Sequence, residues 1–405
     1  MQVGNNLHLT YCTNIHPGET WQEIFSSLKF YINPIKQKLC PDQAFGIGLR
    51  LSNIAAQELL EESRLQDFIT WLKENNLYVF TMNGFPYGTF HRDKVKDDVH
   101  KPDWTTTERL TYIENLSKIL SRLLPEGMDG GISTSPLSYK PWFKNDPQKI
   151  EEAFRKSTLH LAQLTEKLIK LKAETGKVIH IDIEPEPDGL IENNKEVLEY
   201  FSNWLLPSAS KYLQTFLGLN KDEAEKAIKE HIRVCYDVCH YAVAYEDHQE
   251  ALEELTEAGI KIGKFQISAA LKAGIPKDPE QRQLIADKFR PFVESTYLHQ
   301  VVEIDKNKNI FQFPDLPKAL EALSMSQAVE WRVHFHVPIF MEKYSLLEST
   351  QKDILEVLKL AKTQNYTNHL EVETYTWEVL PPEERLDLTL SIQRELDWVK
   401  NQLGA

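Results

Sequence analysis

The chain has 405 residues, of which 41% are hydrophobic and 26% charged, and its formal net charge at pH 7 is −14 with an isoelectric point near 5.5. This composition suits a large soluble globular protein, and the negative balance works against broad binding to nucleic acid or anionic lipid. The first residues lack a basic region followed by a long apolar one, and no later run reaches about 18 apolar residues. We therefore predict a cytoplasmic protein without membrane insertion.

The first half of the chain alternates short β-rich runs with longer helical patterns. Strands are predicted at 7–12, 45–51, 78–82, 130–134 and 178–183. Helices are predicted at 21–39, from the second strand through Trp71, at 107–124 and at 146–175, the last of them ended by Gly176 as a C-cap. Helical crossovers of this length are what parallel strands require.

The second half continues the alternation and then loosens. Helices at 194–206 and 221–231 precede a sixth strand that begins at Arg233, and a seventh strand follows at 260–267. A helix at 281–292 leads to a β-hairpin at 297–313 with a polar DKNKN turn. Two further strands, 332–340 and 369–375, flank a helix at 349–362, and a C-terminal helix is predicted at 382–403.

Outside the hairpin these patterns make nine strands, one more than an eight-stranded barrel holds. Either 332–340 lies outside the ring or one of the early strands is wrong. The fold class predicted is α/β, a (β/α)8 TIM barrel with long loops. It forms a single domain over 1–405 with an insertion at 273–331, although two or three smaller domains would also fit the length.

Four predicted strands carry acidic or amide side chains at or near their carboxyl ends: Glu184, Asp237, Gln266, and Glu371 with Glu373. The carboxyl ends of barrel strands face one crevice, where repulsion between carboxylates raises their pKa values unless a cation neutralises them. Carboxylate and amide oxygens suit Mn²⁺ or Mg²⁺ better than a thiol-bound zinc site. The sequence therefore predicts one divalent metal ion at the barrel mouth, although rim charges solvated by water are the alternative.

His240 stands three residues after Asp237, in the apolar run from Arg233 to Tyr245. On an extended strand, residues three apart point to opposite faces, so these two side chains converge only if the strand ends between them. We therefore predict a strand end near Cys239.

Four segments resemble strand ends of the xylose-isomerase-like TIM barrel superfamily, in the order of that family. IEPEPDG at 183–189 resembles the IEPKP-type strand end of xylose isomerases, and CYDVCHYAVAYE at 235–246 resembles the D-T-C-H-A signature of the related apurinic endonucleases. FQISA at 265–269 resembles the H-x-Q-I-A strand of hydroxypyruvate-isomerase-like members, and LEVET at 370–374 resembles the final L-E-T strand end. The resemblance spans 7–377.

This resemblance implies a set of metal ligands, namely Glu184, Asp237, Gln266 and Glu373, with Mn or Mg as the first choice and Zn as the second. Glu371, two residues before Glu373 and one layer deeper in the predicted barrel, is the rival ligand and the less reachable base. His240 would hold a substrate oxygen or extend the site. The endonucleases use a histidine-rich zinc cluster, whereas the seventh strand here offers Gln266 and the expected D-x-H is replaced by His334-Phe335-His336. Cleavage of abasic DNA is therefore not expected.

Other residues are weaker candidates for substrate contacts. Lys264 could contact an anionic substrate, or it could be a lysine at the rim of the barrel that only balances charge. His16 and Tyr87 lie on loops predicted to face the same mouth. His336 shares a strand face with His334, and a core histidine with satisfied hydrogen bonds is the alternative for it.

YCTNIHPG at the start and HLEVETYTWEVLP near the end narrow the resemblance to the EboE group of metabolite-traffic proteins. Three functions for a small-molecule metabolite stay open. The first is a metal-dependent sugar isomerase or epimerase in which Glu184 and Glu373 move the proton. The second is a metabolite-binding or traffic protein without turnover, and the third is a metal-dependent phosphoester hydrolase.

Overall fold

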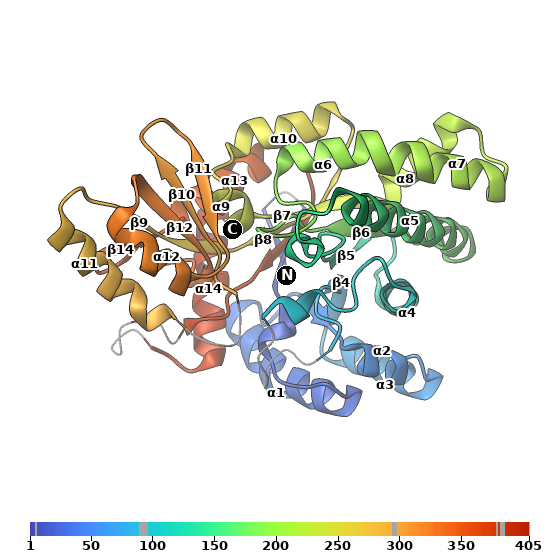
Figure 1. Ribbon diagram of the computed structural model, residues 1–405. Helices are drawn as coiled ribbons and strands as arrows, with labels where there is room; N and C mark the ends of the chain where they lie inside the picture. The colour runs from blue at the N-terminus through green and yellow to red at the C-terminus, as the bar shows by residue number, and fades with distance from the viewer. Residues whose placement is uncertain (5, 89–95, 294–297, 378–379, 381–384, 405) are drawn as a thin grey trace.

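Eight parallel strands form a closed ring at the centre of the protein (Figure 1). The computed structural model describes residues 1–404 except 5, 89–95, 294–297, 378–379 and 381–384. Around the ring the strands are β2 (Leu7–Tyr11), β3 (Phe45–Arg50), β4 (Leu77–Asn83), β5 (Gly130–Thr134), β6 (Ile179–Ile183), β7 (Ile232–Asp237), β8 (Ile262–Ile267) and β15 (His369–Val372). The predicted TIM barrel is confirmed.

The ring closes in two different ways. The last strand, β15, lies between the first and seventh strands and pairs in parallel with both β2 and β8. Between β2 and β3 the backbone forms one bridge, Cys12 to Gly48, and the Thr10 hydroxyl completes the seam by donating to the Gly46 carbonyl (2.8 Å) and accepting from the Gly48 amide (3.0 Å). A short strand, β1 (Gln2–Val3), adds to β2 in antiparallel fashion.

Helices surround the ring, as the parallel crossovers require (Figure 1). They are α1 (Trp21–Leu39), α2 (Asn53–Leu59), α3 (Glu62–Glu74), α4 (Thr107–Leu123), α5 (Pro147–Thr175), α6 (Asn194–Tyr200), α7 (Leu206–Leu217), α8 (Lys221–His231), α9 (Val238–Val243), α10 (His248–Glu257), α13 (Gln351–Thr363) and α14 (Leu388–Leu403). In the described part of the chain, none of the helices is both long and apolar enough to cross a membrane.

Local sequence signals account for the helix ends. α1 begins with a capping box in which the Thr20 hydroxyl accepts from the Glu23 amide and the Glu23 carboxylate accepts from the Thr20 amide. α5 begins at the Asp146 cap and ends at Gly176, whose φ of 72° favours glycine. The single helix predicted through Trp71 is two helices, because Glu61 between α2 and α3 has an extended backbone.

A second sheet lies beside the barrel (Figure 1, orange strands) and holds the ninth predicted strand. Its order is β11 (Ile310–Phe313), β10 (Val301–Asp305), β12 (Ala328–Val337), β9 (Ala269–Gly274), β14 (Leu347–Ser349) and β13 (Lys343–Tyr344), with α11 (Pro279–Phe289) and α12 (Leu316–Ala322) in its connections. The surplus strand is thus β12, outside the ring. The predicted hairpin is β10–β11, but the sheet extends beyond the predicted insertion at both ends.

The interior of the ring is polar beneath the mouth. Lys264 on β8 forms an ion pair with Glu371 on β15, and both side chains are fully buried. Asp182 and His180 on β6 are also fully buried and hydrogen-bonded to each other at 2.6 Å. Glycine makes room for these groups, since an added Cβ at Gly48 would overlap the Glu371 carboxylate.

Candidate metal and substrate site

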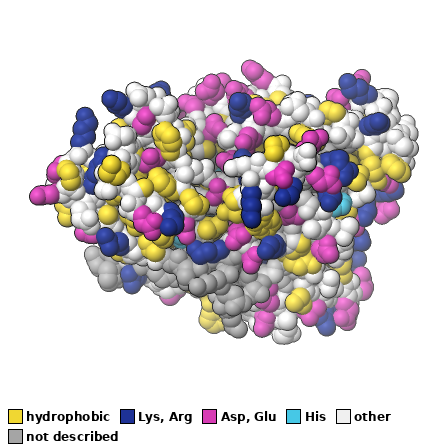
Figure 2. All heavy atoms as spheres, in the orientation of Figure 1, with side chains coloured by type: hydrophobic (Ala, Val, Ile, Leu, Met, Phe, Trp, Pro, Cys, Tyr) yellow, Lys and Arg dark blue, Asp and Glu magenta, His cyan; other side chains and the backbone are white. Residues whose placement is uncertain are grey.

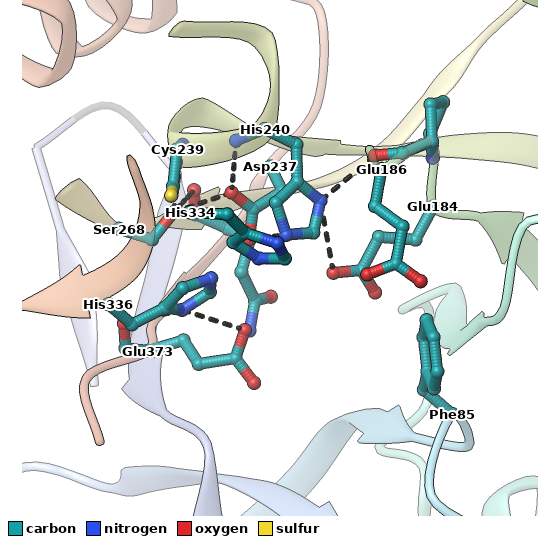
Figure 3. Close-up of polar contacts among 12 residues, drawn as sticks. Phe85, Glu184, Glu186, Asp237, Cys239, His240, Ser268, His334, His336 and Glu373 are labelled. Carbon is teal, nitrogen blue, oxygen red and sulfur yellow. Dashed lines mark hydrogen bonds and ion pairs between the residues drawn. The ribbon is translucent and has the colours of Figure 1, made fainter. Parts of the chain in front are cut away.

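Three carboxylates predicted from separate strand ends meet at the mouth of the barrel. Glu184 directly follows β6, Asp237 is the last residue of β7, and Glu373 follows β15 by one residue. One oxygen from each lies within 4.8 Å of the others, and the three residues are 4%, 0% and 4% exposed, respectively. Figure 3 shows them reaching toward one space from different strands.

Asp237 sits at the turn from β7 into α9. Its Oδ1 accepts hydrogen bonds from the His240 amide at 3.0 Å and from the Ser268 hydroxyl at 2.7 Å, while Oδ2 has no hydrogen-bond partner among the described residues. Because the strand ends at Asp237 and α9 begins at Val238, Asp237 and His240 lie on the same side. This confirms the predicted strand end close to Cys239.

Glu373 is held by donors from two other segments and from its own. Its Oε1 accepts from the Asn14 side chain at 2.9 Å, from the Asn83 side chain at 3.3 Å and from the Tyr375 hydroxyl. These bonds fix one oxygen, and the other, Oε2, lies 3.6 Å from Nδ1 of His336. The orientation of Glu373 is therefore set by the ends of β2 and β4 as well as by its own strand.

Two histidines reach the same space from the second sheet rather than from the barrel. The pairing of β12 with β9 shifts register between Val333 and Val337, so the segment that holds His334 and His336 bulges from the ladder. A bulge re-aims side chains, and here it directs both imidazoles toward His240. Their ring centroids lie 4.6 Å (His334) and 5.6 Å (His336) from that of His240 (Figure 3).

Each of the three imidazoles has a carbonyl oxygen as the partner of Nδ1. The distances are 2.9 Å from His240 to the Pro185 carbonyl, 3.0 Å from His334 to Gln300 Oε1, and 3.3 Å from His336 to the Glu373 carbonyl. A carbonyl only accepts, so Nδ1 carries the proton and Nε2 keeps its lone pair. Histidines that bind metals or substrate hydroxyls are oriented in this way.

Burial dominates the electrostatics of the site. It raises the pKa of Glu184 well above its ordinary value, and the charges of Glu373 and Asp237 raise it further. Burial also lowers the pKa of His240 and, more strongly, that of His334. The site therefore disfavours the simultaneous ionisation of its carboxylates, and a cation would relieve the repulsion between them.

Glu184, Glu373 and the three histidines line a cavity of about 130 Å³. Glu186, two residues after Glu184, adds a third carboxylate to the lining, and Gln300 and Tyr375 add polar groups. Apolar and aromatic side chains complete the wall: Phe85, Pro86, Val99, Leu298 and Phe335. A small cavity with a few convergent polar groups suits a small polar metabolite.

Gln266 lies near the end of β8, where it pairs with Asp237 in register and is 1% exposed. Its Oε1 has no hydrogen-bond partner among the described residues. This orphaned oxygen, the free Oδ2 of Asp237 and the glutamates make an oxygen-rich donor set, so these residues fit a divalent metal ion. The neighbouring imidazoles also suit zinc, and the donor set does not decide between the metals.

Three residues predicted to touch substrate are not brought to this cavity. Lys264 is fully buried in the barrel and paired with Glu371. His16 packs under its own loop, 2.6 Å from the Tyr11 hydroxyl and stacked on Tyr31. Tyr87 lies in a separate surface cleft beside Trp142. Lys264 does balance a charge, but inside the barrel and not at its rim.

The ion pair between Lys264 and Glu371 also decides which of the two rival glutamates on the last strand faces the cavity. Glu371 points into the barrel, where Lys264 binds it, and Glu373 lines the cavity. Sequence reasoning did not single out Glu186, His100, Asn14 or Asn83 as site residues. His334 was noted only as part of the HFH motif, although its alternation with His336 put both on one face.

No family model and no curated protein matches the chain. Among solved structures, the chain is similar to the IolI protein with a zinc atom, at 12% identity over 98% of both chains with a TM-score of 0.45. It is also similar to D-psicose 3-epimerase, at 11% identity over 98% of this chain and 100% of that one with a TM-score of 0.46. A xylose isomerase domain-containing protein from Salmonella typhimurium is similar at 10% identity over 100% of both chains, with a TM-score of 0.43.

These identities and scores are too low to extend the zinc or the sugar chemistry of those proteins to this chain. The narrower resemblance to the EboE group stays a prediction.

Proposed function

We propose that the protein is a divalent-metal-dependent isomerase or epimerase that acts on a small polyhydroxylated or oxo metabolite by proton transfer. The observation that carries the proposal is the convergence of Glu184, Asp237 and Glu373, from three strands, within 4.8 Å of one another beside a small cavity. Two glutamates that flank one cation site suit an acid and a base on either side of an acidic carbon.

The ligand set would be Glu184, Asp237, Glu373 and Gln266. When bound, a divalent ion supplies Lewis acidity that polarises a carbonyl and the hydroxyl next to it. Glu373 acts as the base through Oε2, since Asn14, Asn83 and Tyr375 hold Oε1. Glu184 starts protonated and donates its own proton to the neighbouring carbon or to the opposite face, so that Glu373 ends protonated and Glu184 ionised. Nε2 of His240 accepts a hydrogen bond from a substrate hydroxyl.

The test is hydrogen–deuterium exchange at the carbon next to the carbonyl of candidate ketoses and 2-oxoacids. We expect exchange in the metal-loaded wild type, loss in Glu373→Gln and retention in Asp188→Asn, which removes a charge from the same loop region outside the cavity lining. Glu371→Gln tests the rival base and should keep exchange wherever it folds. No exchange with any carbonyl compound in metal-loaded wild type would contradict an isomerase.

A role as a phosphoester hydrolase has less support. Among the described residues that line the cavity, Lys96 is the one lysine or arginine, and it pairs with Asp315 at 2.9 Å. A phosphate group would therefore meet mainly carboxylates. Metabolite binding without turnover, the role implied by the EboE resemblance, is the alternative if binding is found without exchange.

A further inference from the structure

Glu186 is a carboxylate that the proposed proton transfer does not use. It lines the cavity beside Glu184 and is only 8% exposed. Its Oε1 has no hydrogen-bond partner among the described residues, and the nearest basic atom is Nε2 of His100 at 3.4 Å. Because no described residue donates a hydrogen bond to this buried oxygen, a donor or cation in the cavity would stabilise the carboxylate.

His100 does not supply a positive charge for Glu186. It is buried at the end of the 3-10 turn Lys96–His100, and burial lowers its pKa to about 3, which leaves the imidazole neutral near pH 7. Two aromatic rings line the same wall, those of His100 and Phe85, and their centroids lie 5.4 Å apart. Aromatic faces beside a carboxylate favour a cation.

Glu186 is placed to contact a different part of the substrate from the part that the proposed metal ligands would meet. Figure 3 shows the side chains of Glu184 and Glu186 entering the cavity next to each other, with Phe85 facing them. A substrate whose oxygens lie at Glu184, Asp237 and Glu373 would extend a neighbouring substituent toward Glu186. The described cavity wall offers no lysine or arginine free of a carboxylate partner, which disfavours an anionic substituent there.

From this geometry we infer that Glu186 binds a protonated amine, so that the substrate is an amino-substituted polyol or oxo compound and not a phosphorylated one. The inference rests on the proposed function for the placement of the substrate oxygens. The ammonium donates hydrogen bonds to Glu186 and packs on the rings of Phe85 and His100.

The test compares related probes that differ in charge: benzylamine, benzyl alcohol and benzoate, followed by glucosamine, glucose and glucose 6-phosphate. Binding to the metal-loaded protein is measured by calorimetry. We expect each amine to bind at least 10-fold more tightly than its neutral partner, with the anions weakest. The preference should disappear in Glu186→Gln and persist in Asp188→Asn, whose side chain is on the same loop.

Equal binding of amine and neutral probes to wild type, a preference that survives Glu186→Gln, or no amine binding at millimolar concentration would each overturn the inference. So would a second equivalent of metal that is lost in Glu186→Gln, because Glu186 would then be a metal ligand beside His240 and His334. The two proposals fail separately. Amine binding without carbon exchange contradicts only the isomerase, and exchange confined to neutral ketoses contradicts only the amine site.

Discussion

At the scale of single residues, the ion pair between Lys264 and Glu371 supports the floor of the site. Both side chains are fully buried, so neither charge has water to replace a lost partner. Removing one partner of such a pair costs about 3–5 kcal/mol, whereas replacing both by apolar residues is often nearly neutral. We expect Lys264→Met to lose stability by that amount in urea unfolding, and Lys264→Met with Glu371→Leu to recover most of it. A single variant as stable as wild type would contradict the pairing.

Glu395 on α14 should make the folding stability of the protein depend on pH, and this effect does not involve the candidate site. Burial raises its pKa from 4.5 to about 8, although its Oε1 accepts from the Ile339 amide at 3.0 Å and the Thr374 hydroxyl at 2.9 Å. Between these two values the folded state keeps a proton that the unfolded state releases, so this group makes folding less favourable as the pH rises.

Glu395→Gln should remove that dependence. At pH 5 the variant and wild type should unfold at similar urea concentrations. Between pH 5 and pH 8 the free energy of unfolding of the variant should rise relative to that of wild type by up to roughly 1.4 kcal/mol for each pH unit. A difference in stability that is constant with pH would mean that Glu395 is already ionised in the folded protein.

At the scale of elements, glycines on the barrel strands make room for the polar interior. A Cβ at Gly263 on β8 would overlap the carboxylate of Asp182, which is fully buried and hydrogen-bonded to His180. Because that side chain has no room to move, we expect Gly263→Ala to cost about 1–3 kcal/mol in chemical unfolding. Gly274→Ala on β9 is the matched control, because the nearest atom to an added Cβ there is 4.0 Å away. Equal stability of the two variants would argue against a packed interior at Asp182.

Periodicity was sufficient to predict the ring strands and most helices, because each is defined by local pattern and end signals. The second sheet was harder, since β9 has the sequence AALKAG, which has little β-propensity and is held in place by β12 and β14. The three carboxylates were predictable because parallel strands bring their carboxyl ends together. His100 was not, because its place depends on a turn in a long loop, and Lys264 was misplaced because its depth in the barrel depends on its pairing with Glu371.

At the scale of the whole molecule, metal binding should be visible as stability. A ligand that binds only the folded state stabilises it by about 2.7 kcal/mol at 100 times its Kd. We expect Mn²⁺ or Zn²⁺ to raise the thermal midpoint of the chelator-treated protein and elemental analysis to find about one ion per chain. Glu184→Gln and Asp237→Asn should abolish the rise, and Asp188→Asn should retain it. A stoichiometric metal that survives both site changes would place the ion elsewhere.

The surface charge bears on nucleic acid as a partner. The net charge is −14, and acidic and basic side chains are interspersed over the face shown in Figure 2. An acidic chain gains little from the release of counterions, so we predict no salt-sensitive binding to duplex DNA. Micromolar binding in a mobility-shift assay at about 0.15 M salt, with cleavage at an abasic site, would contradict this prediction.

The position of β15 between β2 and β8 has a consequence for how the protein is made. β15 pairs with a strand that is more than 350 residues away in the sequence, since Leu7–Tyr11 pairs with His369–Val372. During synthesis the seven earlier strands leave the ribosome well before β15 does. Until β15 is available, the edges of β2 and β8 that it pairs with stay unpaired. Open edges of this kind favour association with other nascent chains. The protein should therefore depend more on chaperones while it is being synthesised than its acidic surface would suggest.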